Sequence, residues 1–211
     1  MREMTIDTIT LRVATMDDAG ATADLLVQLY RAEVPGVLHG PTAGQVQLFQ
    51  HILTHELACG VGGRYVATRP DGRILGSASI RTPARSSDNL LPPGTLRAAI
   101  ATVGVGDTLR LILSALRASC ISDIVLSSGE CYIYSVVVDS AARGHGVGMA
   151  MMGQIEDEAR RHGARAALLR VVVGNDTARR LYVRLGYQPV SRTPAILDRI
   201  TFPTELMRKE L

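Results

Sequence analysis

The chain has 211 residues, of which 46% are hydrophobic, a size and composition that suit one folded domain over residues 1–211 and exclude a disordered chain. Its formal net charge is +3 and its arginines are scattered, so composition favours no nucleic-acid partner. The three cysteines lack CxxC pairing and the N-terminus lacks an apolar signal segment, so we expect a cytoplasmic protein with reduced thiols. No apolar run approaches roughly 18 residues without a charge, so we expect no membrane partner.

The first part of the chain alternates between strand and helix patterns. Residues 9–15 alternate in polarity as a strand does, and a helix follows with one apolar face. Residues 42–59 form a second helical stretch. Residues 63–80 predict a hairpin, because two β-rich runs flank Pro70-Asp71-Gly72, whose proline and glycine suit a turn. The apolar face of the first helix carries Leu25, Leu26, Leu29 and Tyr30.

Residues 81–129 depart from this pattern. They begin with the turn-rich stretch RTPARSSDNLLPPG and continue with an apolar stretch, residues 108–125, that is typical of a helix. We interpret residues 81–129 as a helical insertion between the third and fourth strands.

The last part of the chain predicts a strand over 131–138, a glycine-rich loop, a helix, a strand over 164–173, a helix over 177–186 and short strands. The loop carries Gly144, Gly146 and Gly148 in alternation, directly before helix-forming residues. Unpaired N–H groups and the helix dipole at such a helix start both favour an anion.

Two phosphate-binding designs fit this loop poorly. A P-loop needs GxxxxGK[ST], and no lysine lies near the loop. A dinucleotide fingerprint needs GxGxxG/A after the first strand, whereas here the glycines are evenly spaced and Met149 holds the third-glycine position. No acidic residue ends the following strand to bind a ribose. A dinucleotide-dependent oxidoreductase is therefore a weak alternative.

A third design agrees with two motifs. Val138-Asp139 followed by Arg143-Gly144-His145-Gly146-Val147-Gly148 resembles motif A of the GNAT acetyltransferases, V-D-x-x-x-R-G-x-G-x-G. Residues 175–187, from Asn175 through Tyr182 to Tyr187, resemble motif B of the same family, N-x-x-A-x-x-L-Y-x-x-x-G-[FY]. The resemblance implies an α/β fold with a central mixed, mostly antiparallel sheet flanked by helices, whose fourth and fifth strands splay apart.

The resemblance also implies how acetyl-CoA is bound. The backbone of Val136 and Val138 would pair with the pantetheine arm, as in strand addition. Asn175 and Tyr182 would complete the cosubstrate site, although Asn175 also suits a helix N-cap. Ala141 departs from the motif, which often has Gln or Arg there. The pyrophosphate would lie on the amides of Arg143, Gly144, His145, Gly146, Val147 and Gly148.

The resemblance assigns the catalytic roles less completely. Tyr182 matches the tyrosine that commonly protonates the departing CoA sulfur, and an amide in the Val136–Val138 stretch would stabilise the oxyanion. A free alkylamine has a pKa of roughly 10 and needs a base. The positions where the family often has a strand glutamate hold Tyr134 and Tyr132, so the base is predicted to be Glu130, with a strand tyrosine or water as alternatives.

The sequence thus predicts an N-acetyltransferase that moves an acetyl group from acetyl-CoA to a primary amine of a small molecule, by direct attack in a ternary complex. The alternatives are an inactive acyl-CoA-binding module or a protein N-terminal or lysine acetyltransferase. The 81–129 insertion would wall the acceptor pocket, form a homodimer face or have no specific role. His51, His55 and Cys59 recur at helical spacing without HExxH or a fourth ligand, so we expect no metal.

Overall fold

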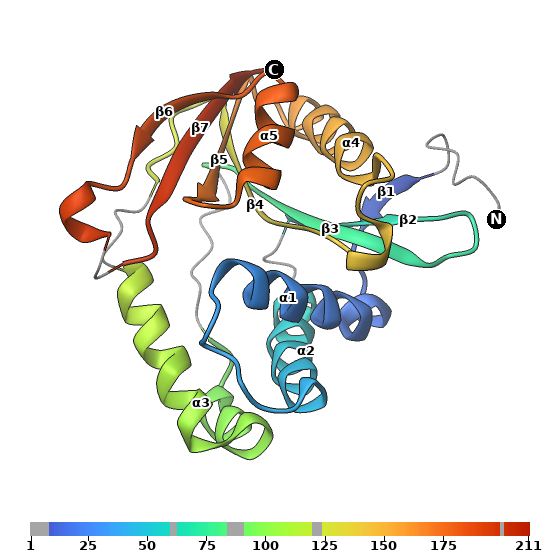
Figure 1. Cartoon of the computed structure of the whole chain (residues 1–211). Helices are drawn as coiled ribbons and strands as arrows, with labels where there is room; N and C mark the ends of the chain where they lie inside the picture. Colours follow the sequence, from blue (N-terminus) through green and yellow to red (C-terminus); the bar gives the residue numbers. More distant parts are fainter. Residues whose placement is uncertain (1–8, 60–62, 84–90, 120–123, 199–200) are drawn as a thin grey trace.

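A computed structural model describes residues 9–59, 63–83, 91–119, 124–198 and 201–211 (Figure 1). Within this part of the chain, seven strands form one sheet in the order β1-β2-β3-β4-β5-β7-β6. Neighbouring strands pair antiparallel except β4 and β5, which are parallel. The predicted mixed, mostly antiparallel sheet is confirmed. The strands are β1 (Thr10–Val13), β2 (Gly63–Thr68), β3 (Ile74–Arg81), β4 (Glu130–Val138), β5 (Ala166–Val172), β6 (Gln188–Arg192) and β7 (Thr204–Glu210).

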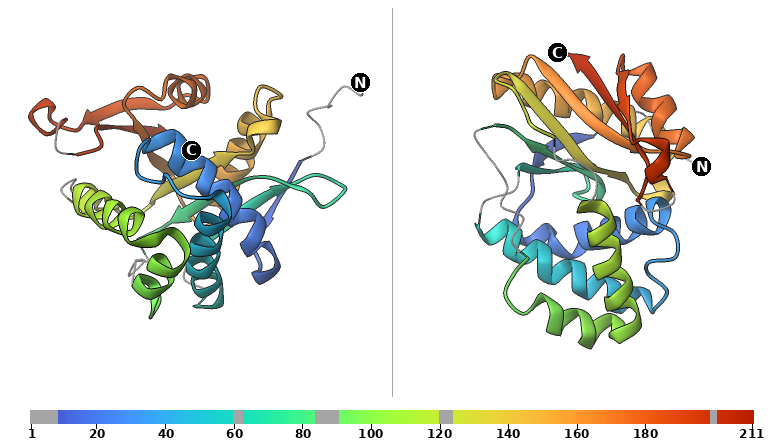
Figure 2. Two further views of the ribbon diagram at one scale, coloured as in Figure 1. Left: turned by 60° about the horizontal axis from the view of Figure 1, so that its bottom comes forward. Right: turned by 90° about the vertical axis from the view of Figure 1, so that its left-hand side faces the viewer.

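Helices cover both faces of the sheet (Figures 1 and 2). On one face α1 and α2 pack together, with α3 beside α2, and on the other face lie α4 and α5. The helices are α1 (Ala19–Glu33), α2 (Thr42–Cys59), α3 (Thr95–Ser119), α4 (Val147–Arg161) and α5 (Asp176–Arg184). Methionines and aliphatic residues fill the core between α4 and the sheet, where Met151, Met152 and Ile155 are fully buried. A second apolar cluster joins α1 to α2 through Leu26, Phe49 and Leu53.

The sheet opens between β4 and β5. Glu130–Ile133 of β4 pairs with Ala166–Leu169 of β5, but the remaining residues of β4, up to Val138, have no pairing with β5. The β4 edge beyond Ile133 therefore leaves backbone groups without a strand partner among the described residues. This is the splay that the resemblance implies.

A β-bulge lies at the point where β4 and β5 separate. The register with β3 shifts between Ser77 and Ser79, and Ser135 has a φ of 51°, in the left-handed region. The extra residue changes which side chains face α4, from odd-numbered positions before the bulge to even-numbered ones after it. The β4 residues that pack on that side are Cys131, Ile133, Val136 and Val138.

The insertion is helical as predicted, but its helix has different bounds. Helix α3 begins at Thr95 rather than at residue 108, and residues 124–127 are not helical, while 120–123 lie outside the described residues. Gly104 has a φ of 80° and divides α3 into two segments. The first segment, residues 95–103, directly follows the turn-rich stretch 81–94, and the second, residues 105–119, contains most of the helix that the sequence predicts.

Helix α3 is also the one described helix that is long and apolar enough to cross a membrane. An 18-residue window within Thr95–Arg117 reaches a mean hydropathy of 1.5, and 28% of that window is buried. A span needs about 20 residues of continuous helix, and the break at Gly104 interrupts it. Because α3 also packs against α2 and lines a cavity, we interpret it as a wall of that cavity.

An ion pair between the buried Asp18 and the exposed Arg12 fixes the entry into α1, and we expect Asp18→Asn to destabilise the fold. Asp18 accepts hydrogen bonds from Arg12 Nη1 (2.6 Å) and Nη2 (2.8 Å) and from the Thr15 amide (2.7 Å). The Arg12 hydrogen bond lowers the pKa of Asp18 to about 2. By linkage, the variant should lose about 2 kcal/mol of unfolding free energy at pH 7.

The pH dependence of this loss has a defined sign. Because the folded-state pKa lies below the unfolded-state value, the stabilisation is complete above about pH 4 and is lost as pH falls towards 2. Urea unfolding at pH 7 and at pH 2.5 should therefore show a difference between wild type and Asp18→Asn that shrinks in acid. The exposed neighbour Asp17 gives the control, since Asp17→Asn should change stability by less than about 0.5 kcal/mol. Equal losses at the two positions would contradict this assignment.

Candidate active site

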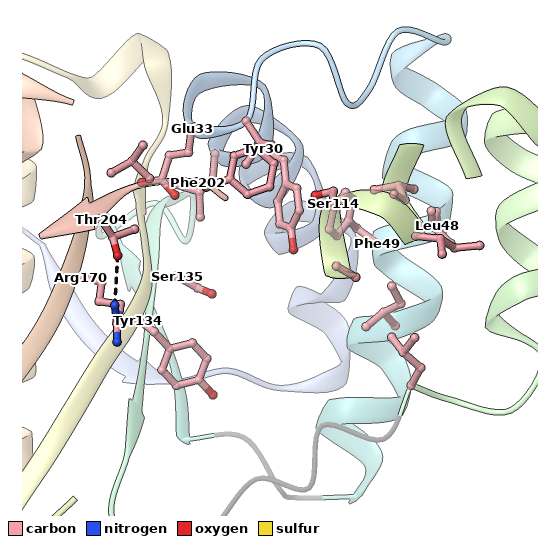
Figure 3. Close-up of a pocket in the computed structure, with 18 of the residues that line it drawn as sticks. Tyr30, Glu33, Leu48, Phe49, Ser114, Tyr134, Ser135, Arg170, Phe202 and Thr204 are labelled. Carbon is pink, nitrogen blue, oxygen red and sulfur yellow. Dashed lines mark hydrogen bonds between the residues drawn. The ribbon is translucent and has the colours of Figure 1, made fainter. Parts of the chain in front are cut away.

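A cavity of about 650 Å³ lies beside the opening in the sheet (Figure 3). Its floor comes from β4, β5 and β7, and its walls come from α1, α2 and α3. Ser135 and Val136 line it next to the bulge, and Tyr182 of α5 lines it from the other side of the opening. The cavity therefore reaches the unpaired edge of β4.

The loop after β4 is built by an aspartate and two left-handed glycines. Asp139 Oδ1 accepts a hydrogen bond from the Ala141 amide (3.0 Å) and begins a short 3-10 turn, Ser140–Ala142. Gly144 and Gly146 have φ values of 80° and 79°, which favour glycine. Gly146 is the N-cap of α4 and its helix start has no side-chain cap, so the first amides of α4 are free to bind an anion.

The other residues of the loop have separate structural roles. A Cβ on Gly148 would lie 3.3 Å from Leu181 Cδ2, so this glycine lets α4 pack closely on α5. Arg143 is exposed and donates from Nε to the Val138 carbonyl at 3.0 Å, which occupies that carbonyl. His145 is exposed and its Nδ1 lies 2.9 Å from the Arg143 carbonyl. The loop residues 143–148 do not line the cavity, and Val147 is buried in the apolar core.

Tyr182 brings a buried hydroxyl to the cavity. It lies on α5 with 6% of its surface exposed, and its ring meets Tyr187 edge to face at 5.9 Å. Burial, together with the nearby charge of Glu33, raises the pKa of Tyr182 well above its ordinary value. The hydroxyl therefore stays protonated and can donate a hydrogen bond into the cavity.

Asn175 has two partners. Its Oδ1 accepts a hydrogen bond from the Ala178 amide at 3.2 Å, which caps α5. Its side chain also forms a hydrogen bond with the carboxylate of Glu33, which accepts. Motif B thereby positions an acidic residue that comes from α1, far away in the sequence.

Glu33 is a candidate functional residue that the sequence reasoning missed. It ends α1, lines the cavity, and its charge acts on both Tyr182 and Tyr132. Burial raises the pKa of the Glu33 carboxyl, and the Asn175 hydrogen bond offsets part of this effect. One signal in the sequence points to it, because an acidic residue at a helix C-terminus opposes the helix dipole. It also follows Leu26 and Tyr30 on the same helix face.

Glu130, the residue predicted to be the base, lies elsewhere. It begins β4, accepts a hydrogen bond from the Ser127 amide (3.0 Å) and pairs with Arg208 (3.3 Å). The Ser127 hydrogen bond and the pairing with Arg208 lower the pKa of Glu130. Glu130 does not line the cavity. The alternation along β4 places it on the face of Tyr132, but at the end where β4 and β5 are still paired.

The strand tyrosines do line the cavity. Tyr132 and Tyr134 stack with their ring centroids 5.9 Å apart, and Arg81 lies over the Tyr132 ring. Burial raises the pKa of both hydroxyls. Both therefore stay neutral near pH 7, where they act as hydrogen-bonding groups rather than as bases.

Among the described residues, no three His, Cys, Asp or Glu side chains are grouped so that they could hold a metal ion. Of the helical trio on α2, Cys59 Sγ lies 3.8 Å from His55 Nδ1.

Comparison with known proteins identifies the family. The profile of the Acetyltransferase (GNAT) family matches residues 29–187. No curated protein matches the chain significantly. Taken together, the split sheet and the matched segment define an acetyltransferase. The chain belongs to the GNAT family.

Solved acetyltransferases share this fold at low sequence identity. YncA, a putative acetyltransferase from Salmonella typhimurium solved with its cofactor acetyl-CoA, is 17% identical with a TM-score of 0.57, covering 97% of this chain and 95% of that one. A GCN5-related N-acetyltransferase from Kribbella flavida is 21% identical with a TM-score of 0.56, covering 98% and 100%. A ribosomal-protein-alanine N-acetyltransferase from Brucella melitensis is 17% identical with a TM-score of 0.57, covering 96% and 99%.

Proposed function

We propose that the protein transfers an acetyl group from acetyl-CoA to a primary amine of a small molecule, by direct attack in a ternary complex. The observation that carries this proposal is the opening between β4 and β5, which joins an unpaired strand edge to a cavity that holds Glu33 and Tyr182. A cosubstrate lying along the strand edge would present its acyl group between these two side chains.

The residues present fit acetyl-CoA. The unpaired edge of β4 around Val136 offers backbone groups to an amide-containing arm. Gly144, Gly146 and the free amides at the start of α4 suit a pyrophosphate. The cosubstrate supplies a thioester, whose carbonyl is the electrophile.

Glu33 is suited to accept the proton of the amine. It is a half-buried carboxylate whose raised pKa makes it a stronger base than an exposed glutamate. Asn175 holds its carboxylate in place from α5. We therefore assign the role of general base to Glu33 rather than to Glu130, whose carboxylate is already bound to Arg208 and Ser127 outside the cavity.

Tyr182 is suited to stabilise the departing thiolate. A thiol has a pKa near 8.5, about 1.5 units below that of an ordinary tyrosine, and burial raises the pKa of Tyr182 further. Full proton transfer to the thiolate is thus uphill, whereas a hydrogen bond from a protonated hydroxyl to a charged sulfur is favourable. Donation of this hydrogen bond is the role we assign to Tyr182.

The cavity favours a small acceptor over a protein. Helix α3 closes the side away from the sheet, so an acceptor has about 650 Å³ in which to lie. The name of the Brucella melitensis neighbour shows that this fold also serves a protein substrate. In the present chain, the wall that α3 adds supports the small-molecule acceptor.

Calorimetric titration tests cosubstrate binding. We expect micromolar affinity for acetyl-CoA and none for NADH, and we expect Gly146→Val to weaken acetyl-CoA binding at least about tenfold. A β-branched residue at a φ of 79° is strained, and Gly146 is the N-cap residue from which α4 and its free amides begin. Gly163→Val places the same strain at a φ of 82° beyond the other end of α4, and should leave binding unchanged. Tighter binding of NADH than of acetyl-CoA would overturn the proposal.

Release of free CoA thiol in the presence of amines then separates the enzyme from its alternative. An inactive acyl-CoA-binding module would bind acetyl-CoA but release no thiol with any amine.

A further inference from the structure

The cavity is lined mainly by apolar side chains, which come from every helix that surrounds it. Leu48 and Phe49 of α2 lie across the cavity from Arg170 and Thr204 (Figure 3). Helix α3 adds a further apolar wall. The apolar lining residues contributed by α3 are Leu96, Ala99, Leu111, Ile112 and Ala115.

Packing holds this wall in place. Ala99 and Thr108 of α3 are 5% and 3% exposed, and Leu111 packs against the apolar cluster of α1 and α2. Asp107 accepts hydrogen bonds from the amides of His39 (2.9 Å) and Gly40 (2.8 Å), which ties α3 to the chain between α1 and α2. Helix α3 is thus fixed against the rest of the fold and forms a stable wall of the cavity.

The cavity offers few charged groups to a polar acceptor. Among the described lining residues, Glu33 is the one carboxylate and Arg170 the one cation, and Arg170 donates to Thr204 at 3.1 Å. A polyamine would place its second ammonium group against Arg170 or among apolar side chains, where an unpaired charge is costly.

An amino sugar would find only the hydroxyls of Thr95, Thr108 and Ser114 among the described lining residues of α2 and α3. Two of these hydroxyls already donate to backbone carbonyls, those of Pro92 and Gly104, so most hydroxyls of the sugar would lack a donor on this side.

We propose that the acceptor is a primary amine with an apolar alkyl or aryl body. The amine lies at Glu33, and the body extends between α2 and α3. This inference rests on the proposed acetyl transfer and names its acceptor class.

A series of n-alkylamines from ethylamine to octylamine tests the inference, with thiol release from acetyl-CoA as the readout. Each methylene buried in the cavity should raise kcat/KM about fourfold until the chain fills the space. Spermidine should be a poorer substrate than hexylamine, although it offers more amines. A flat series, or a preference for spermidine, would overturn the inference while leaving acetyl transfer intact.

The same cavity would accommodate a long acyl chain of the donor instead of the apolar body of the amine. A second experiment decides between these two occupants of the apolar space. Octanoyl-CoA with ethylamine is compared with acetyl-CoA and octylamine. We expect the second pair to react at least about tenfold faster. Faster reaction of the first pair would mean that the apolar space holds the acyl donor, which overturns the inference.

Two matched variants locate the effect on α3. Leu111→Ser changes a partly buried lining residue and should lower kcat/KM for octylamine about tenfold, with little change for ethylamine. Leu113→Ser makes the same change at a residue that is 58% exposed and outside the lining, and should change neither amine more than about twofold. If Leu111→Ser lowers the melting temperature markedly, Ile112→Ser, at a lining residue 42% exposed, replaces it. Equal effects of Leu111→Ser and Leu113→Ser would contradict the assignment.

Binding distinguishes failure of the inference from failure of the proposed function. If no amine releases thiol, acetyl transfer to small amines is wrong. Calorimetry of ethylamine and octylamine with the CoA-bound protein still tests the acceptor class. Tighter octylamine binding, with a negative heat-capacity change, supports it, and equal binding overturns it.

Discussion

Replacing Glu33 by glutamine should lower kcat about 10²- to 10⁴-fold, the loss typical of a missing general base. The amide keeps the size of the side chain and a hydrogen bond to Asn175, but it cannot accept a proton. Steady-state thiol release with saturating acetyl-CoA and amine measures this loss, and calorimetry should show acetyl-CoA binding within about threefold of wild type.

The pH dependence of kcat gives an independent signature. The base must be deprotonated, and because burial raises the pKa of Glu33, the acid limb of the wild-type profile should lie above the ordinary range of glutamate. In Glu33→Gln this limb should disappear. The rate should instead keep rising towards pH of about 10, where the amine loses its own proton. A wild-type limb that persists in Glu33→Gln would show that another group is the base.

Glu130→Gln is the matched comparison, because it makes the same change at the residue that the sequence favoured. It weakens contacts to Arg208 and Ser127 outside the cavity, and we expect kcat to fall by no more than about threefold. A larger loss in Glu130→Gln than in Glu33→Gln would return the role of base to Glu130.

Removing the hydroxyl of Tyr182 should have the second-largest effect. A hydrogen bond to a charged group is worth about 1.5–3 kcal/mol, so Tyr182→Phe should lower kcat roughly 10- to 100-fold. Because the pKa of Tyr182 is raised, the wild-type profile should show no basic limb from this residue below pH of about 10. The loss should therefore be the same at pH 7 and at pH 9.

Tyr187→Phe removes a hydroxyl from the ring that contacts Tyr182, but outside the cavity lining. It should keep kcat within about threefold of wild type, and a thermal melt reports any change in stability. A loss equal to that in Tyr182→Phe would mean that the tyrosine pair acts through packing and not through hydrogen-bond donation.

Local patterns predicted most of the fold. The hairpin around Pro70-Asp71-Gly72, the strand before Asp139 and the two C-terminal helices depend on neighbouring residues, and the structure confirms each. The glycine-rich loop was predicted for the same reason, because glycine is the residue that local backbone with a left-handed φ favours. Gly144 and Gly146 both have such a φ.

The base and the wall of the cavity depend on contacts that are distant in the sequence. The sequence marks Glu33 only as an acidic residue at a helix C-terminus, and its role becomes clear when α1 meets Asn175, across about 140 residues of chain. Glu130 shares a strand face with Tyr132, but strand alternation does not reveal where β4 and β5 separate. The full extent of α3 is not apparent from the sequence because Gly104 divides its apolar pattern into two parts, and only the second part is long enough to predict a helix by itself.

The short contact between β4 and β5 also bears on how the two substrates affect each other's binding. Strands β1 to β4 and strands β5, β7 and β6 form two ladders that meet along Glu130–Ile133 and Ala166–Leu169 alone. We expect a pairing this short to open at lower free energy than a full ladder, which would make the width of the gap between β4 and β5 adjustable. A substrate that contacts both β4 and β5 would favour one width of this gap. It would thereby change the shape of the cavity that remains for the other substrate. Linkage makes this coupling reciprocal, so that each substrate strengthens or weakens the binding of the other by the same factor.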